Sequence, residues 1–219
     1  MDSVSNVGVL DKAVGVLRAL ERCGPSGLAE LQGATGLPRA TAHRLARALE
    51  HHGLVRRDGE GRFCLGLALV GLGHAAAESF PLAELARPAL VALRDRIGES
   101  VQLFVVEGDG RRCVVSLQSA HGLRWIVPEG ALLPLHVGSA GRVLSGDLGP
   151  HGWVESVEER EAGVASVSAP VRDPDGRLLA AVSVSGPVER LSREPGARYG
   201  AAVVATAAEV AAAAAATRF

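Results

Sequence analysis

Residues 28–36 read LAELQGATG, residues 37–53 read LPRATAHRLARALEHHG, and residues 54–65 read LVRRDGEGRFCL. The first two segments have the pattern of two helices joined by a turn, because Gly36 permits a tight turn and Pro38 supplies the fixed φ of a first helical residue. In the third segment, the run DGEG separates two apolar runs, as the connection of a tight β-hairpin does. This order of elements predicts a winged helix-turn-helix, a fold that binds DNA.

The second predicted helix has two faces of different chemistry. An apolar stripe at helical spacing, which would pack inward, consists of Ala42, Leu45 and Leu49. The opposite face collects small residues and hydrogen-bond donors: Ala40, His43, Arg44, Arg47 and His51. An ordinary solvated face mixes Glu and Lys instead, so this face is suited to a DNA groove.

The distribution of charge supports DNA binding by one local patch. Residues 37–62 hold six Arg against three acidic residues, whereas the whole chain holds 23 basic and 24 acidic residues. A near-neutral chain with one basic patch suits site-selective binding better than nonspecific coating of nucleic acid. A small helical bundle whose arginines are merely solvated is the alternative.

Length and composition predict a two-domain cytoplasmic protein. The chain has 219 residues, of which 47% are apolar, and a winged helix needs only about 65 to 80 residues. Cys23, Cys64 and Cys113 are widely spaced and form no Cys-x-x-Cys pair, so we expect a reducing compartment, no metal site and no cofactor. The N-terminus lacks a signal pattern and no uninterrupted apolar run reaches ~20 residues, so we expect no membrane association.

We expect a DNA-binding domain over residues 7–66, a linker helix over 67–79 and a second domain over 80–219. An amphipathic helix at the start of the first domain would pack beneath the helix-turn-helix. The linker carries Leu67 and Val70 in an Ala-rich run with almost no charge. We expect it to be buried, either in a dimer contact or against the body of the protein.

The second domain combines helical and strand patterns. A helix over residues 81–97 is expected to kink or break at Pro88, and an Ala-rich helix from 197 to about 217 closes the chain. Period-two apolar patterns and turn signals predict strands at 101–105, 113–117, 123–127, 165–171 and 178–185. This α+β arrangement is typical of a GAF-like, effector-binding domain.

These features together resemble the IclR family of bacterial transcription regulators. The resemblance is carried by TAHRLARALEHHGLV at 41–55, LPLHVGSAGRV at 133–143, GVASVSAPV at 163–171 and AAVSVSGP at 180–187. It implies a sequence-specific DNA-binding regulator under the control of a small metabolite, and the likeness is greatest to actinobacterial regulators of leucine and other amino acid biosynthesis. Regulation of aromatic or carboxylic acid catabolism is the second hypothesis. A hydrolase is a distant third, because the chain has no G-x-S-x-G elbow.

The resemblance places the helix over residues 38–52 in the major groove, where its N-terminal residues would reach base edges. We expect base contacts from Arg39, Ala40, His43 and Arg44, because Arg can bind guanine with two hydrogen bonds and Ala can contact a thymine methyl. Phosphate contacts are expected from Thr41, Arg47 and Arg62. For Arg47, which lies deeper in the helix, an ordinary exposed surface is an equal alternative.

The resemblance also implies the effector contacts: Ser139, Ala140, Ser166, Ser183 and Ser185, with apolar walls near Leu123 and Leu133. The pattern alone puts Ser183 and Ser185 on one strand face, but such serines could also face solvent. The GSAG run opens a predicted helix whose backbone N–H groups would favour a carboxylate. The expected effector is therefore an amino acid or a related carboxylate.

Two further expectations concern assembly and length. One recognition helix covers few base pairs, so we expect a homodimer or homotetramer on pseudo-palindromic operator DNA. Compared with the family pattern, residues 146–150 connect the GSAGRV run directly to the strand near His151, where relatives have a further helix. This is either a true deletion or an omitted segment, and it bears on how closed the ligand pocket is.

Overall fold

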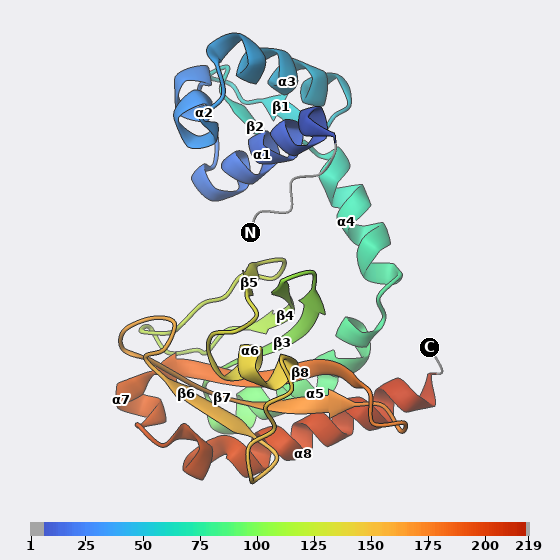
Figure 1. Ribbon diagram of the computed structural model, residues 1–219, viewed down its shortest axis with the longest axis vertical. Coiled ribbons are helices and arrows are strands. Elements are labelled where there is room, and N and C mark those ends of the chain that lie inside the picture. The colour runs from blue at the N-terminus through green and yellow to red at the C-terminus, as the bar shows by residue number, and fades with distance from the viewer. Residues whose placement is uncertain (1–6, 218–219) are drawn as a thin grey trace. The chain divides into compact units, whose positions relative to one another are not determined.

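The computed structural model describes residues 7–217, which divide into two compact units at Phe80 and Pro81 (Figure 1). The linker helix α4, Ala68–Glu78, groups with the first unit. The last two residues of the expected second domain lie outside the described part of the chain. Each unit has its own hydrophobic core.

The first unit is the predicted winged helix-turn-helix. Its elements are α1 Gly8–Cys23, α2 Leu28–Thr35, α3 Arg39–His51, β1 Val55–Arg57 and β2 Phe63–Leu65. The two strands pair antiparallel, and Ser26 exchanges two backbone hydrogen bonds with Phe63 at their edge. Helices and wing share one core, in which Val16, Leu31 and Phe63 are fully buried.

The turn between α2 and α3 forms largely as the sequence predicts. Gly36 adopts the left-handed conformation with φ 67°, and its N–H donates to Gln32 O at 2.9 Å, which ends α2. Pro38, however, is the residue before the helix rather than its first residue, since its ψ is 142°. Its carbonyl accepts the first helical hydrogen bond from Ala42 N–H, and α3 begins at Arg39.

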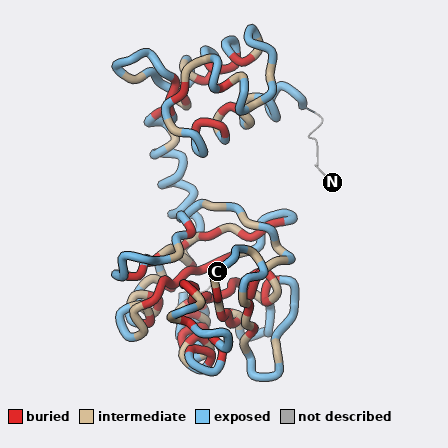
Figure 2. Tube along the Cα trace, turned by 90° about the vertical axis from the view of Figure 1, so that its left-hand side faces the viewer, coloured by how far each residue is buried: buried red, intermediate tan, exposed pale blue. Residues whose placement is uncertain are grey.

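The helix α4 contains no buried residue (Figure 2). Leu67, just before it, is 75% exposed and Val70 is 69% exposed. Within the first unit, the expected burial of this helix is therefore not found. Its start is joined to the helix-turn-helix by a hydrogen bond from Ala68 N–H to Gly53 O. A dimer contact stays a prediction.

The second unit is built on one antiparallel sheet of six strands in the order β5-β4-β3-β8-β7-β6. The strands are β3 Ser100–Glu107, β4 Gly110–Leu117, β5 Leu132–Pro134, β6 Val154–Val157, β7 Val164–Arg172 and β8 Leu178–Pro187. On one face lie α5, Leu82–Ile97, and α8, Pro195–Ala216 (Figure 1). On the other lies the short helix α6, Ser139–Leu144, while α7, Val188–Leu191, follows β8.

Strict alternation along the central strands separates an apolar face from a polar one. Val182 and Val184 of β8 pack into the core beneath α5 and α8, whereas Ser183 and Ser185 lie on the side of α6. The strands β7 and β3 follow the same rule, with Val167 and Val101 on the helical side. The serines are consequently enclosed between the sheet and its covering loops instead of facing solvent.

Two expectations about the second unit need correction. Residues 123–127 form no strand; Arg190 donates to Leu123 O at 2.8 Å, and Ser100 Oγ donates to Trp125 O at 3.0 Å. The strand β5 pairs with β4 instead. Of the kink or break expected at Pro88, the break is wrong, since α5 is continuous and its buried Ala86 and Leu90 pack on the sheet; the kink stays a prediction.

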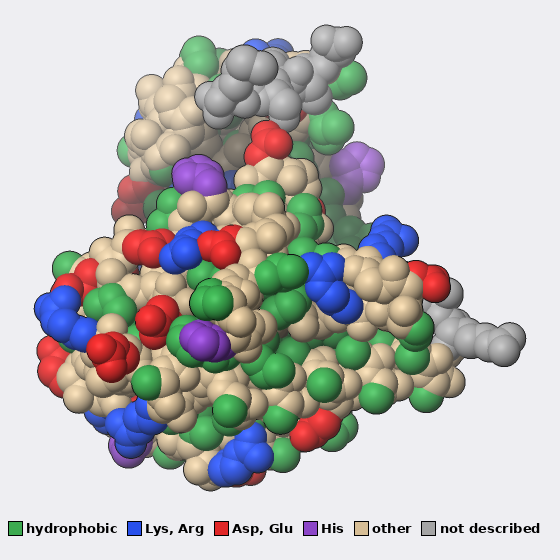
Figure 3. Space-filling view, turned by 60° about the horizontal axis from the view of Figure 1, so that its bottom comes forward, with side chains coloured by type: hydrophobic (Ala, Val, Ile, Leu, Met, Phe, Trp, Pro, Cys, Tyr) green, Lys and Arg blue, Asp and Glu red, His purple; other side chains and the backbone are tan. Residues whose placement is uncertain are grey.

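Within residues 7–217, α8 is the one helix long and apolar enough to cross a membrane by length and composition. Tyr199, Val203 and Val210 bury one of its faces in the core of the second unit. Figure 3 shows that arginine and acidic side chains are interspersed with hydrophobic ones on the face that it displays. We therefore interpret α8 as the core helix of a globular domain.

Candidate DNA interface and ligand pocket

The helix α3 presents the predicted polar face to solvent. Arg39, Ala40, His43, Arg44 and Arg47 are exposed, and Thr41 is half-buried. Its opposite face is buried in the core of the unit by Ala42, Leu45, Ala46 and Leu49. Because the core fixes the rotation of the helix, the exposed side chains can change without repacking the fold.

The arginines at the start of α3 are available to a partner. Among the described residues, Arg39 and Arg44 take part in no ion pair, whereas Arg47 binds Glu50 at 2.8 Å. The start of the helix thus carries free guanidinium groups, and the deeper Arg47 is partly neutralised. This arrangement agrees with base contacts from the first turns.

The wing is held by its own ion pairs. Arg62 binds Asp58 at 2.8 Å and Glu60 at 3.2 Å, and Asp58 Oδ1 also accepts the backbone N–H groups of Glu60 and Arg62. Desolvation acts against ionisation of Asp58, but these hydrogen bonds outweigh it and lower the pKa of the carboxyl group. The predicted phosphate contact of Arg62 must therefore compete with two carboxylates.

Arg56 of β1 is a second cation of the wing, to which the sequence analysis assigned no contact. It is exposed and has no ion pair within residues 7–217, while its neighbour Arg57 lies over the ring of Phe63 and 3.4 Å from Glu50. Its position in the basic run before the hairpin turn was the available signal.

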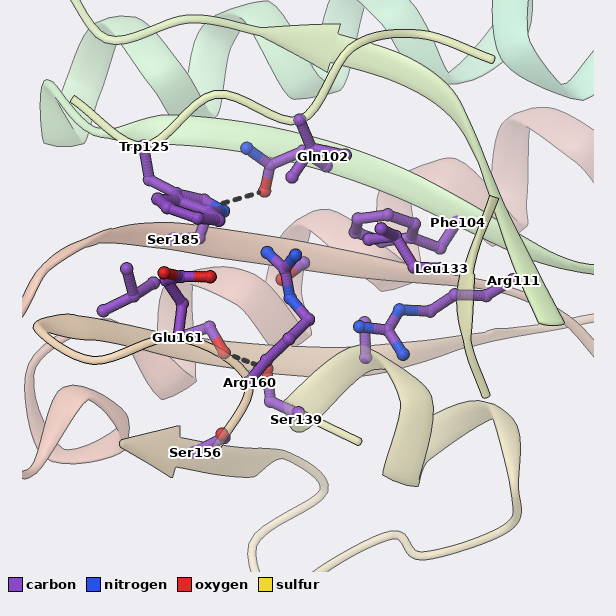
Figure 4. A pocket seen from close by; sticks show the side chains of 16 residues that line it. Gln102, Phe104, Arg111, Trp125, Leu133, Ser139, Ser156, Arg160, Glu161 and Ser185 are labelled. Carbon is purple, nitrogen blue, oxygen red and sulfur yellow. Dashed lines mark hydrogen bonds between the residues drawn. The ribbon is translucent and has the colours of Figure 1, made fainter. Parts of the chain in front are cut away.

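The second unit contains a pocket between the sheet and α6, with a cavity volume of about 40 Å³ (Figure 4). Its lining includes six of the predicted effector residues: Leu133, Ser139, Ala140, Ser166, Ser183 and Ser185. Leu123 is not among them, since its side chain is 71% exposed; Trp125, two residues later, lines the pocket.

The serines form a continuous hydrogen-bonded network. In the sheet, Ser166 pairs with Ser185 and Ser168 pairs with Ser183. Ser139 Oγ lies 2.7 Å from the hydroxyls of both Ser166 and Ser168, and Ser168 Oγ donates to Ser183 Oγ at 2.9 Å. A hydroxyl can both donate and accept a hydrogen bond, so these serines, which form the floor of the pocket, can bind either a donor or an acceptor group of a polar ligand.

Two arginines and two aromatic rings form other walls of the pocket. The guanidinium of Arg111 lies 5.4 Å from the ring centre of Phe104, and that of Arg160 lies 4.9 Å from the ring centre of Trp125. Burial, reinforced by repulsion from Arg160, lowers the pKa of Arg111 to about 10. The pocket therefore combines hydroxyl groups, π faces and positive charge (Figure 4).

The start of α6 is partly occupied by the chain itself. Gly138 N–H donates to Glu159 Oε2 at 3.0 Å, so a carboxylate of this protein already binds the backbone where a ligand carboxylate was expected. The helix has only six residues. Its N-terminus is consequently a weak explanation for anion binding.

The comparisons with known proteins cover both units. The IclR helix-turn-helix domain matches residues 9–59, and the C-terminal domain of the bacterial transcriptional regulator IclR matches residues 74–150 and 147–212. The chain belongs to the IclR family. Both matched domains are those of transcription regulators, not of enzymes, and this IclR-family protein is accordingly a DNA-binding regulator with a C-terminal effector-binding domain.

Curated relatives extend over most of the chain. The glycerol operon regulatory protein of Streptomyces coelicolor is 32% identical over 229 residues, covering 86% of this chain and 88% of the relative. The transcriptional repressor IclR of Escherichia coli is 26% identical over 228 residues, covering 87% of this chain and 83% of the relative. Neither name indicates regulation of leucine biosynthesis.

Solved structures share the whole fold. A transcriptional regulator from Rhodococcus sp. RHA1 has a TM-score of 0.77 at 25% identity and covers 97% of this chain and 100% of its own. An IclR homologue from Microbacterium hydrocarbonoxydans complexed with 4-hydroxybenzoate also has a TM-score of 0.77, at 20% identity, with 96% and 100% of the chains covered. At that identity the second likeness shows the fold alone.

The short connection at residues 146–150 coincides with the boundary between the two C-terminal matches. In the structure this connection is held by contacts of the Asp147 carboxylate, which binds Arg142 at 2.7 Å and accepts the N–H of Gly149. It leads from α6 directly to β6. The pocket lining does not include these residues.

The lining residues that sequence reasoning missed include Gln102, Arg111, Trp125 and Arg160. Arg160 lies outside helices and strands, so no periodic pattern was available for it, and Trp125 falls in the strand that was wrongly expected at 123–127. Gln102 is fully buried in a strand among apolar residues, and a lone polar residue inside such a run was a usable signal.

Proposed function

We propose that this IclR-family protein binds operator DNA through the start of α3 and changes its operator affinity when a small polar metabolite enters the pocket of its second unit. The observation that carries the first half is the exposed start of α3, which carries Arg39, His43 and Arg44 and has no carboxylate among residues 39–46. The enclosed serine network supports the second half. The proposal places the protein in the cytoplasm, where operator DNA lies.

Operator selection from a pool of random duplexes tests the DNA half. Purified full-length protein should enrich a pseudo-palindrome whose half-sites lie about one helical turn, or a multiple of it, apart. Binding of the enriched site should exceed that of scrambled DNA by at least about 10³-fold at physiological salt. Recovery of no common sequence would contradict the proposal.

The same proposal includes a homodimer or a dimer of dimers. Its motivation is the exposed run formed by Leu67, just before α4, and by Val70 and Leu72 within it, since a cluster of exposed apolar side chains is characteristic of an interaction site. Sedimentation velocity at micromolar concentration should show a species of at least twice the chain mass. A monomer alone would refute this part.

Two candidate pathways are proposed for the regulated genes. Amino acid biosynthesis of the leucine type is the first candidate and rests on the sequence resemblance alone. Catabolism of aromatic or other carboxylic acids is the second. The relatives named for glycerol and acetate operons decide for neither. The genes flanking the selected operator would separate the two.

Effector and operator must be coupled reciprocally. If a ligand weakens operator binding tenfold, it must itself bind the DNA complex tenfold less tightly, which corresponds to about 1.4 kcal/mol. Titration of the protein and of the protein–DNA complex with branched-chain amino acids and their keto acids tests this. Equal ligand affinity with and without DNA would contradict regulation by that ligand.

A further inference from the structure

We propose that Arg111 binds a negatively charged group of the effector, so that the pocket selects small carboxylates against neutral molecules of the same shape. The inference deepens the proposed function, because it takes the serine-lined pocket as the effector site. It assigns the charge recognition to a strand residue instead of the start of α6.

The first step is the burial of Arg111 without a counter-charge. The residue is only 3% exposed, and within residues 7–217 no carboxylate lies within ion-pair distance of it. Among the described residues, its side chain makes one hydrogen bond, to the carbonyl of Pro134. A buried guanidinium normally has an anionic partner, because desolvation of an unpaired charge is costly. Among the groups able to enter this pocket, an anion would lower that cost most.

The second step concerns unsatisfied hydrogen bonds. Among the described residues, two buried side-chain nitrogen atoms have no partner, Gln102 Nε2 and Arg111 Nε. Both belong to residues that line this pocket, and both are donors. Since buried donors are normally satisfied, the missing partner is an acceptor, and a carboxylate offers two oxygen atoms to such donors.

The third step is the shape of the site around the guanidinium. A side chain on Gly138 would begin 3.5 Å from Arg111 Nη2, and one on Gly141 would collide with Arg111 Nη1. These glycines of the GSAG run therefore leave the space that the guanidinium occupies. On the other side lies Phe104. The group is held between a backbone turn and a ring, which fixes the plane of its N–H donors.

The remaining lining limits what can accompany the charge. Trp125 and Phe104 suit an apolar or planar body, and the serine floor suits hydroxyl or carbonyl groups. Glu161 is the one carboxylate among the described lining residues, and it could accept an ammonium group. A free amino acid and its keto acid share the carboxylate, and the experiment distinguishes them.

Thermal-shift and calorimetric titrations of the full-length protein test the proposal with matched pairs. The probes are benzoate with benzamide, 4-hydroxybenzoate with its amide, 2-oxoisocaproate with its amide, and leucine with leucinamide. We expect at least one carboxylate to stabilise the protein and its amide to bind roughly 10- to 150-fold more weakly, the range for hydrogen bonds to a charged group. Preference for leucine over 2-oxoisocaproate would identify an amino acid ligand that uses Glu161.

Arg111→Met is the decisive variant. It should lose the discrimination between each acid and its amide, and its own melting temperature should not fall, because an apolar residue removes an unpaired buried charge. Arg111→Lys keeps the charge and should keep the preference with lower affinity. Arg112→Met is the control, since the neighbouring Arg112 pairs with Glu107 and does not line the pocket.

Three results would overturn the proposal. The first is equal stabilisation of the protein by acids and amides, and the second is no stabilisation by any of the carboxylates at about 10 mM ligand, a concentration that would detect weak binding. The third is an Arg111→Met protein that melts several degrees lower than the wild type. The last would show that Arg111 is a satisfied structural group. Operator selection is measured separately on the ligand-free protein, so failure of the DNA-binding proposal is a different observation.

Discussion

The two units direct their polar side chains in opposite ways. In the first, α3 turns Arg39, His43 and Arg44 outward from a small apolar core. In the second, β7 and β8 turn Ser168 and Ser183 inward, onto the enclosed face of a sheet. Water satisfies the first group, but neighbours or a ligand must satisfy the second. The outward side chains can therefore be replaced to suit a different operator sequence without loss of folding stability. Replacement of the inward side chains would lower the stability of the second unit.

The arginines make the same comparison within one residue type. Neither Arg44 nor Arg111 has a carboxylate partner among the described residues, yet Arg44 is exposed and Arg111 is 3% exposed. Solvent stabilises the charge of Arg44, so its lack of a partner says little about function by itself. Burial removes that stabilisation from Arg111, and the missing partner there indicates a ligand.

The largest change in stability that would sharpen the comparison of the two units is expected from a substitution of Gly200 in α8. A methyl group at this position would collide with the indole of Trp153, which packs against the core of the second unit. Gly200→Ala should destabilise that unit by about 3 kcal/mol, the upper end for overpacking. Urea denaturation monitored by tryptophan fluorescence measures it.

The matched control is Gly33→Ala in α2, where a methyl group would meet no atom within 4 Å. It should leave the second unit unchanged and stabilise the first by up to about 1 kcal/mol, the difference in helix propensity. If both substitutions had the same effect, the packing argument for Gly200 and Trp153 would fail.

The next effect concerns Arg44. Arg44→Ala should reduce affinity for the selected operator by about 2 kcal/mol, or roughly 30-fold, if the side chain binds a base with two hydrogen bonds. Its exposed position predicts an unchanged melting temperature. Competition binding against scrambled DNA is the measurement. An equal loss on both DNAs would show that Arg44 contacts the backbone and not a base.

The sequence predicted what periodicity controls. Burial of Ala42, Leu45 and Leu49 follows from helical spacing, and the shared face of Ser183 and Ser185 follows from strand spacing. Neither needs knowledge of distant residues. The strand expected at 123–127 is absent, and its place beside β4 is taken by residues 132–134; a carbonyl of the segment is bound by Arg190, far along the chain.

Arg111 shows why the charge of the pocket could not be predicted. Strict alternation places it on the same face as Val115 and Leu117, which pack beneath the helices. The pairing of β3 with β4 shifts between Leu103 and Phe104, however, and leaves Val114 unpaired. Such a bulge reverses the direction of the residues before it, so Arg111 faces the pocket instead. A single unpaired residue is invisible to a period-two pattern.

A smaller effect is expected from Ser168, which is fully buried and lies between Ser139 and Ser183 in the hydroxyl network. Ser168→Ala should destabilise the second unit by about 1 kcal/mol, because its neighbours lose a partner. His43→Ala on the exposed face of α3 is the control and should leave the unfolding free energy unchanged. Equal unfolding midpoints for the two variants would break the distinction between inward and outward polar groups.

The smallest effect separates two arginines of the wing. Arg56 has no ion pair within the described residues, whereas Arg62 is held by Asp58 and Glu60. A phosphate contact releases counterions and contributes about 0.9 to the slope of log affinity against log salt. Arg56→Ala should lower the slope by nearly that amount, and Arg62→Ala by less, because its charge is already compensated by carboxylates before DNA arrives. Titrations of the operator with each variant at about 50 to 200 mM salt measure both slopes. A larger change for Arg62 would mean that DNA displaces the two carboxylates, and that the wing rearranges on binding.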